Sequence, residues 1–238
     1  MERECLHILR EQKEKNLRLY SEVQIRMAYH SNRIEGSHLT EEQTRQMFET
    51  HTILAEHTVL YVDDIVQTQN HFAAFDFMLE HAEEDLSMNL IKQFHAILKR
   101  GTSDERKRWF RVGDFKALPN EVGGRETVRP ENVEPELRKL LKQYHALSAV
   151  KVEDIIDFHA RFEAIHPFQD GNGRVGRLIL FRECLKYGIM PFILDEQHKA
   201  FYYRGLQEYP REKGYLMDTC LSAQDTFVAM YPYFIGRG

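Results

Sequence analysis

The chain has 238 residues, of which 42% are hydrophobic and 29% are charged, so it can bury the core of one large domain or of a domain with a helical extension. Its formal net charge is -5 and its basic residues are spread along the chain, which excludes an electrostatic reason to bind duplex nucleic acid. Three widely spaced cysteines exclude a disulfide framework and a CxxC metal or redox motif.

The N-terminus, residues 1–7, is too charged for a signal sequence, and no apolar run approaches the roughly 20 residues that cross a bilayer. Unpaired cysteines favour a reducing compartment. We therefore expect a soluble, unprocessed, cytoplasmic protein with neither a membrane nor a nucleic acid as its partner.

The first expected helix, 2–34, ends in a distinctive group of residues. Ser31 and Glu35 are four residues apart and share one helix face, and Gly36 suits the left-handed residue just past a helix end. A carboxylate at the C-terminal end of a helix is disfavoured by the helix dipole by roughly 0.3 to 1 kcal/mol. Glu35 is therefore predicted to have a compensating partner, and the alternative is a solvated surface acid.

Most of the remaining chain has helical periodicity and little of the alternation that strands need, which indicates an all-α fold without internal repeats. Thr40 and Gln43 form a capping box that starts the next helix. Further helices are expected at 58–81, 87–99, 133–147, 152–165, 174–187, 196–209 and 213–231. One helix face is expected in the core, that of Ile155, Phe158, Phe162 and Ile165.

The segment 110–130 lacks helical periodicity. Turn-forming Pro, Asn and Gly residues between short apolar runs predict a short hairpin there. The basic stretch before it is interrupted by Asp104 and Glu105 and is interpreted as a solvated loop, with one or two cations docking a target as the alternative. Its cations are Lys99, Arg100, Arg106, Lys107, Arg108 and Arg111.

Residues 166–177 lie between two expected helices and carry groups suited to phosphate chemistry. Gly171 and Gly173 let backbone N–H groups turn inward as an anion-binding nest, with the positive end of the next helix behind them. Arg174 and Arg177 are three apart, so both guanidinium groups can bind phosphate oxygens from one helix face. Polyphosphate is the ligand that this arrangement favours.

Two side chains of the same loop supply the remaining chemistry. Asp170 offers a hard oxygen ligand for Mg²⁺, which commonly binds one or two carboxylates together with substrate phosphates. His166, with an ordinary pKa of about 6.5, can accept a proton from an attacking hydroxyl near neutral pH. These are the parts of a phosphoryl or nucleotidyl transferase.

Other glycine-containing loops fit these residues less well. An EF-hand requires an oxygen ligand, a glycine and a glutamate where this chain has Arg174, Val175 and Phe181. A Walker loop requires Gly-Lys followed by Ser or Thr, which is absent. A plain connecting turn has no need of His, Asp, Asn and two Arg at fixed offsets.

The loop resembles the Fic signature, His-x-Phe-x-Asp/Glu-Gly-Asn-Gly-Arg-x-x-Arg, at every defined position. The resemblance covers roughly 86–209 and implies an all-α Fic fold, a helical bundle with a small β-hairpin flap at 110–130. N-terminal helices over 1–85 would precede this core, and a C-terminal helix and tail over 210–238 would follow it. The family resemblance also implies a protein adenylyltransferase that uses ATP and Mg²⁺.

By this resemblance His166 is the general base, Phe168 anchors the loop in the core and Asp170 holds Mg²⁺. The two glycines and Asn172 would bind the α- and β-phosphates, and the two arginines would bind the β/γ end. The candidate nucleotide-binding residues are Asp170, Gly171, Asn172, Gly173, Arg174, Val175, Gly176, Arg177, Tyr202, Tyr203, Val122, Gly123 and Gly124.

Two segments outside the loop are also similar to the family. Tyr202 and Tyr203 resemble the paired tyrosines that line the adenine and ribose pocket, with simple helix packing as the alternative. Pro210 stands where related proteins often have an Asn, a departure from the pattern. The hairpin resembles the flap that holds a target segment by strand addition while its hydroxyl approaches the α-phosphorus.

Residues 31–36 resemble the Fic inhibitory motif, Ser/Thr-x-x-x-Glu-Gly/Asn, of the subclass with an N-terminal inhibitory helix. The resemblance makes Ser31, Glu35 and Gly36 inhibitory residues and names Arg177 as the partner of Glu35. With that guanidinium occupied, ATP would bind with its α-phosphorus misplaced for in-line attack.

These expectations describe an autoinhibited enzyme that transfers AMP to a Ser, Thr or Tyr hydroxyl of a protein docked at the flap. Self-modification and oligomerisation stay open. The alternatives are hydrolytic removal of AMP with Glu35 aligning a water, a non-catalytic nucleotide-sensing module, and transfer of another phosphate-linked group.

Overall fold

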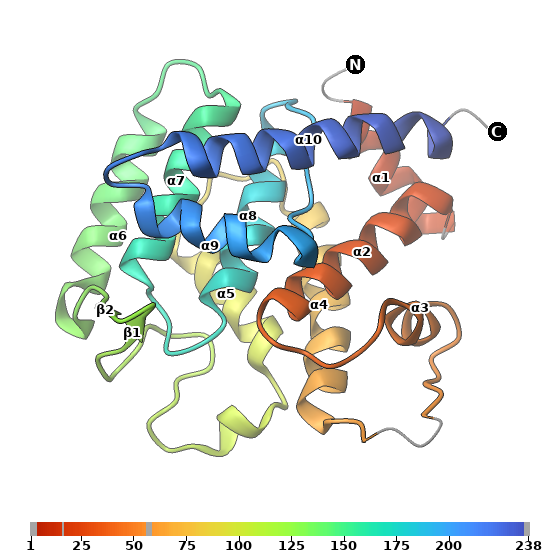
Figure 1. Ribbon diagram of the computed structural model, residues 1–238, viewed down its shortest axis with the longest axis horizontal. Coiled ribbons are helices and arrows are strands. Elements are labelled where there is room, and N and C mark those ends of the chain that lie inside the picture. Colours follow the sequence, from red (N-terminus) through yellow and green to blue (C-terminus); the bar gives the residue numbers. More distant parts are fainter. Residues whose placement is uncertain (1–3, 16, 56–58, 236–238) are drawn as a thin grey trace.

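The computed structural model describes residues 4–15, 17–55 and 59–235, which fold into a bundle of α-helices with one two-stranded hairpin (Figure 1). No helix in these residues is long and apolar enough to cross a membrane. The α-helices of the described residues are α1 Glu4–Lys15, α2 Arg18–Ile34, α3 Glu41–Glu49, α4 Val62–Glu80, α5 Met88–Lys99, α6 Pro130–His145, α7 Val152–Ile165, α8 Asn172–Lys186, α9 Lys199–Glu208 and α10 Gly214–Ile235. Short 3-10 helices span Ser103–Arg106 and Glu196–His198, and the strands are β1 Glu121–Val122 and β2 Arg125–Glu126.

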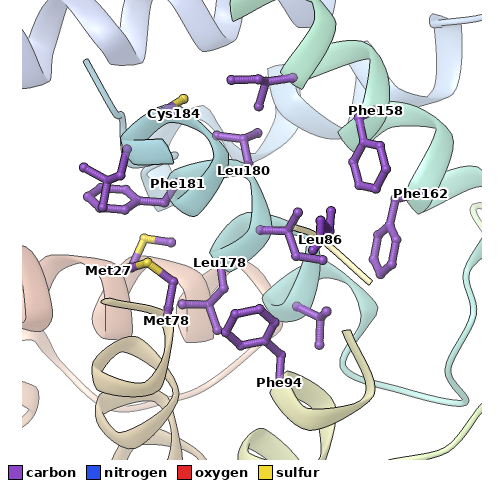
Figure 2. Close-up of a cluster of buried hydrophobic side chains, with 14 of the residues drawn as sticks. Met27, Met78, Leu86, Phe94, Phe158, Phe162, Leu178, Leu180, Phe181 and Cys184 are labelled. Carbon is purple, nitrogen blue, oxygen red and sulfur yellow. The ribbon is translucent and has the colours of Figure 1, made fainter. Parts of the chain in front are cut away.

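Helix α8 occupies the centre of the bundle (Figure 1). Every residue from Asn172 to Leu185 is buried, and α8 contacts α1, α2, α4, α5 and α7. A helix that is buried all round belongs in the interior, so the other helices form its shell. Figure 2 shows side chains from this shell meeting those of α8, among them Met27, Met78, Phe94, Phe158, Phe162, Leu178, Leu180 and Phe181.

Several local expectations are confirmed. The four apolar residues of α7 are buried, with exposed fractions between 0% and 7%. The Thr40 hydroxyl accepts from the Gln43 N–H at 3.1 Å and the Gln43 side chain accepts from the Thr40 N–H at 3.0 Å, so the capping box forms. Gly36 follows the end of α2 with φ +98. Each follows from the spacing or type of residues close in sequence, which explains why the pattern predicted it.

The expectation of one helix over 2–34 is wrong at Leu17, whose extended backbone (φ -89, ψ 167) separates α1 from α2. The Gln12 side chain accepts from the N–H groups of Leu19 and Tyr20 at 2.8 and 3.2 Å, which satisfies donors at the new helix start. Apolar periodicity runs through the break and so conceals it. Positions 2–3, 16 and 58 of the expected helices, and 236–238 of the tail, lie outside the described residues.

The hairpin is smaller than its 110–130 prediction, because each strand has two residues, paired Glu121 with Glu126 and Val122 with Arg125. The segment before it is held by buried Lys116. Its ammonium donates to Asn120 Oδ1 at 2.7 Å and to Thr127 Oγ1 at 2.6 Å. The backbone N–H of the same lysine donates to the Pro167 carbonyl at 2.9 Å. The hairpin base is thereby fastened to the loop between α7 and α8.

Candidate active site

His166 ends α7 in a left-handed conformation (φ 53). Its Nδ1 lies 3.3 Å from the Glu163 carbonyl, which can only accept, so Nδ1 carries the proton and Nε2 keeps a free lone pair. Burial, and then the nearby Lys116 ammonium, lower the pKa of His166 to about 4. With 17% of its side chain exposed, the imidazole is a neutral, reachable base at pH 7.

The loop after His166 is anchored by Phe168, which is fully buried and stacks on His95 with ring centroids 4.0 Å apart. Asn172 closes the loop: its Oδ1 accepts from the Phe168 N–H at 2.7 Å and its Nδ2 donates to the Phe168 carbonyl at 2.9 Å. Asn172 is 1% exposed. The anchor role of Phe168 agrees with this geometry. The Asn172 side chain holds the shape of the loop, and its contact with a phosphate stays a prediction.

The N-terminus of α8 is built to accept an anion. Gly171 precedes it with φ +85, and the first N–H groups of any helix lack partners inside the helix. A Cβ at Gly173 would overlap Glu35 Oε1 and would lie 2.9 Å from Arg177 Nη1. Glycine at 173 therefore lets a carboxylate come against the helix end, and the same space suits a phosphate oxygen.

Arg177 is bound by residues at the end of α2. Its Nη2 donates to Glu35 Oε1 at 2.7 Å and to the Ser31 carbonyl at 2.9 Å, and its Nε donates to Ser31 Oγ at 3.0 Å. The guanidinium is 3% exposed, and within the described chain its Nη1 has no hydrogen-bond partner. The predicted ion pair of Glu35 and Arg177 is confirmed, and Ser31 joins it from the same helix face.

Asp170 is half-exposed and is flanked by two cations, Lys99 Nζ at 2.6 Å and Arg174 Nη2 at 3.0 Å. Although burial alone would raise it, these cations hold the pKa of Asp170 well below its usual range. Among the described residues no three His, Cys, Asp or Glu side chains cluster to bind a metal. One ionised, accessible carboxylate beside a phosphate site fits Mg²⁺, which takes most of its ligands from substrate and water.

Lys99 is a residue that the sequence interpretation misplaced. The basic stretch around it was expected to be a solvated loop, but the Lys99 side chain is 0% exposed and also pairs with Asp104 at 2.5 Å. Its two acidic partners, Asp104 and Asp170, are 5 and 71 residues away along the chain, so only the fold brings the three side chains together.

The two tyrosines of α9 have separate surroundings. Tyr202 is 1% exposed, with its hydroxyl 2.8 Å from His159 Nε2 and its ring 5.9 Å from the Arg177 guanidinium. Tyr203 is 38% exposed, and its hydroxyl donates to the Ile34 carbonyl at 3.2 Å. Tyr202 therefore packs near Arg177, and Tyr203 connects α9 to the end of α2. Contacts of either tyrosine with a nucleotide stay a prediction.

The five remaining candidates lie in two places, two of them in α8 and three in the hairpin. Val175 is fully buried and its N–H donates to Gly171, so it has a packing role. Gly176 also packs inward, because a Cβ there would overlap Glu163 and lie 3.0 Å from His159. The hairpin-turn residues, for which nucleotide binding stays a prediction, are exposed: Val122, Gly123 and Gly124.

Glu163 was not among the sequence candidates. It lies in α7 beneath Gly176, and its Oε1 is buried and has no hydrogen-bond partner in the described chain. Burial raises the pKa of Glu163 to about 8, against the attraction of Arg177. Its Oε2 lies 3.9 Å from His166 Nδ1, so this acid stands directly behind the base.

Comparison with known proteins agrees with this geometry. Residues 85–183 match the Fic/DOC family model. Protein adenylyltransferase fic-1 of Caenorhabditis elegans is 26% identical over 196 residues, which cover 79% of this chain and 37% of the relative. Protein adenylyltransferase Fic of Drosophila virilis is 25% identical over 86% of this chain and 42% of the relative. The chain thus spans less than half the length of these relatives.

A solved structure shows the same fold. A Fic domain containing signaling protein from Bacteroides thetaiotaomicron superimposes with a TM-score of 0.74 at 19% identity, covering 96% of this chain and 93% of that one. At this identity the likeness concerns the fold alone. Residues 85–183 are thus similar to the Fic/DOC domain, and the fold of the chain is that of solved Fic proteins.

Proposed function

We propose that this protein is an autoinhibited protein adenylyltransferase, which transfers AMP from ATP to a Ser, Thr or Tyr hydroxyl of a protein. The observation that carries the proposal is the folded loop itself: a neutral His166, an ionised Asp170 and the anion-accepting helix end at Gly173 lie along one short stretch. The names of the relatives support the type of reaction.

In the proposed reaction His166 Nε2 accepts the proton of the target hydroxyl. The hydroxyl oxygen then forms a bond to the α-phosphorus of ATP, the bond from that phosphorus to the bridging oxygen breaks, and pyrophosphate leaves. The N–H groups at the start of α8, with Arg174 and Arg177, hold the phosphates. Asp170 would hold Mg²⁺, which supplies charge neutralisation of the phosphates when bound.

The target segment is proposed to dock at β1 and β2. All four strand residues are exposed, so an extended chain can reach an open hairpin edge. The hairpin is held close to the chemistry, because Asn120 Nδ2 donates to the Phe168 carbonyl at 3.1 Å and Arg125 donates to the Gln207 carbonyl of α9 at 2.8 Å. The acceptor can belong to another protein or to this chain.

Autoinhibition is proposed from the position of Glu35. Its carboxylate is the anion that now lies against Gly173 and Arg177, where the terminal phosphates of ATP would bind. ATP must then either displace Glu35 or bind with its α-phosphorus out of line. An ion pair with a 3% exposed guanidinium is costly to break without a replacement anion, because the charge left behind is buried.

The second candidate function is hydrolytic removal of AMP from a modified protein. The observation that favours it is that the same Glu35 carboxylate lies within the site, where it could align a water molecule. In this case Glu35 is a catalyst and its removal abolishes the reaction. A nucleotide-sensing module without turnover would need neither Glu35 nor His166.

The test uses ATP labelled at the α-phosphate, Mg²⁺ and four proteins: wild type, Glu35→Gly, Glu35→Gly with His166→Ala, and Glu196→Gly. The control removes the 2.6 Å ion pair of Glu196 with Arg33, which also holds the end of α2 but does not touch Arg177. Label should enter protein strongly only with Glu35→Gly. Labelling in the double variant would exclude His166 as the base. If Glu196→Gly were labelled as strongly as Glu35→Gly, the ion pair of Glu35 with Arg177 would be excluded as the specific cause of inhibition.

Purified AMP-modified product then separates the two directions. Wild type should leave the modification in place if the protein is a transferase. Release of AMP by wild type, and not by Glu35→Gly, would identify the hydrolase.

A further inference from the structure

Lys99 is the last residue of α5 and is a fully buried cation. Burying an ammonium group is unfavourable by several kcal/mol unless the charge is paired. Here Nζ donates to Asp104 Oδ2 at 2.5 Å and to Asp170 Oδ2 at 2.6 Å. One of its two counter-ions is thus the acid that the proposed function assigns to the metal.

The side chain is held rigidly in this position. A Cβ at Gly171 would meet Lys99 Cδ at 3.4 Å, so the methylene groups of Lys99 pack against the residue that precedes α8. The Phe110 ring lies 5.3 Å from Nζ, and the Lys99 carbonyl accepts from the Thr102 hydroxyl at 2.8 Å. Neither the stem nor the ammonium can move away without disturbing the loop.

The charges around Asp170 are therefore already balanced. Lys99 and Arg174 both contact Oδ2, while the Asp170 side chain stays 49% exposed. A divalent cation bound to this carboxylate would lie roughly 5 Å from the Lys99 ammonium, given usual metal–oxygen and hydrogen-bond lengths. Like charges at that distance in a partly buried site repel strongly. A polyphosphate arriving with the metal supplies the negative charge that offsets this repulsion.

We propose that Lys99 is a positioning residue that holds Asp170 in the nucleotide-free protein and keeps the site from binding a divalent cation until the nucleotide arrives. The inference rests on the proposed function, which places the metal at Asp170. A consequence of the inference is that the metal and the nucleotide bind as a pair, because the Lys99 ammonium already pairs with Asp170 in the nucleotide-free site.

A merely structural role for Lys99 makes a different prediction. If the lysine only fills buried space, its replacement changes stability and leaves metal binding to the nucleotide-free protein unaltered. If it competes with the metal, removal of its charge tightens metal binding. Removal of its other counter-ion, Asp104, leaves Lys99 more dependent on Asp170 and should weaken metal binding further.

The experiment measures Mn²⁺ binding to the nucleotide-free protein from the electron paramagnetic resonance signal of the free ion. Lys99→Met, which keeps the length of the side chain, should bind Mn²⁺ at least roughly tenfold more tightly than wild type. Lys107→Met is the matched control, because Lys107 also pairs with Asp104, at 2.6 Å, but does not touch Asp170. It should change the affinity by less than about twofold.

Three further variants keep each outcome decisive. Asp104→Asn should bind Mn²⁺ more weakly than wild type, and it replaces the test by Lys99→Met if that variant does not fold. Lys99→Met combined with Asp170→Asn should lose the gain. Suppose that Lys99→Met and wild type bind Mn²⁺ with equal affinity, while Asp170→Asn still weakens Mn²⁺ binding in the presence of ATP. This result would overturn the role of Lys99 and would leave the metal site intact. No effect of Asp170→Asn in either condition would overturn the metal site of the proposed function as well.

Discussion

Replacement of Glu163 by Gln should change how the stability of the protein depends on pH. The carboxyl group is buried beneath Gly176, its Oε1 has no hydrogen-bond partner among the described residues, and its pKa is raised from 4.5 to about 8, chiefly by burial. Because the folded state has the higher pKa, it binds the proton more tightly than the unfolded chain. Wild-type protein should therefore lose stability as the pH rises from about 4.5 to about 8.

The size of this loss follows from the difference between the two pKa values. At about 1.4 kcal/mol for each pH unit, the difference corresponds to an upper bound of about 5 kcal/mol. Gln has the shape of the protonated acid and cannot ionise. Glu163→Gln should thus match wild type at pH 5 to within about 1 kcal/mol and should exceed it by a few kcal/mol at pH 9.

Urea denaturation at intervals from pH 5 to pH 9 measures the difference in free energy of unfolding between variant and wild type. Subtracting the two curves cancels the titration of the buried histidines. Glu134→Gln is the control: its side chain is 55% exposed, so its curve should run parallel to that of wild type. A flat difference for Glu163→Gln would refute the reasoning, since it would mean that attraction to Arg177 keeps Glu163 ionised in the folded state.

Three further predictions concern the inhibitory residues of α2, the general base and the packing of α9 on α10. Ser31→Ala removes the hydroxyl that accepts from Arg177 Nε at 3.0 Å, so AMP labelling should fall between that of wild type and Glu35→Gly. In Glu35→Gly the transfer rate should be independent of the ionisation of His166 between pH 6 and pH 8, because burial lowers the pKa of that imidazole to about 4; an acid limb centred near 6.5 would contradict this cause. Gly205→Ala would place a Cβ 2.8 Å from a backbone Cα of α10, so thermal unfolding should show a loss of about 1–3 kcal/mol, whereas a gain in stability would show that α10 can move aside.

The sequence alone predicted the features that depend on near neighbours along the chain. The buried face of α7, the capping box at Thr40 and the stop at Gly36 each depend on spacings of at most four positions between successive residues, and the structure contains all three. The loop 166–177 belongs to the same class, because a contiguous motif brings its own base, carboxylate and glycines. Its continuity is why a family resemblance could be recognised before any fold was known.

Other features depend on which helices meet. The partner of Glu35 came from the family resemblance and not from spacing, since Arg177 is 142 residues away. Lys99 was expected in solvent because a count of charges cannot show that Asp104 and Asp170 converge on it. Glu163 was overlooked because an acid on α7 gains its raised pKa only when α8 covers it. The charge state of a side chain is decided by what excludes water from it, and that is a property of the packed structure.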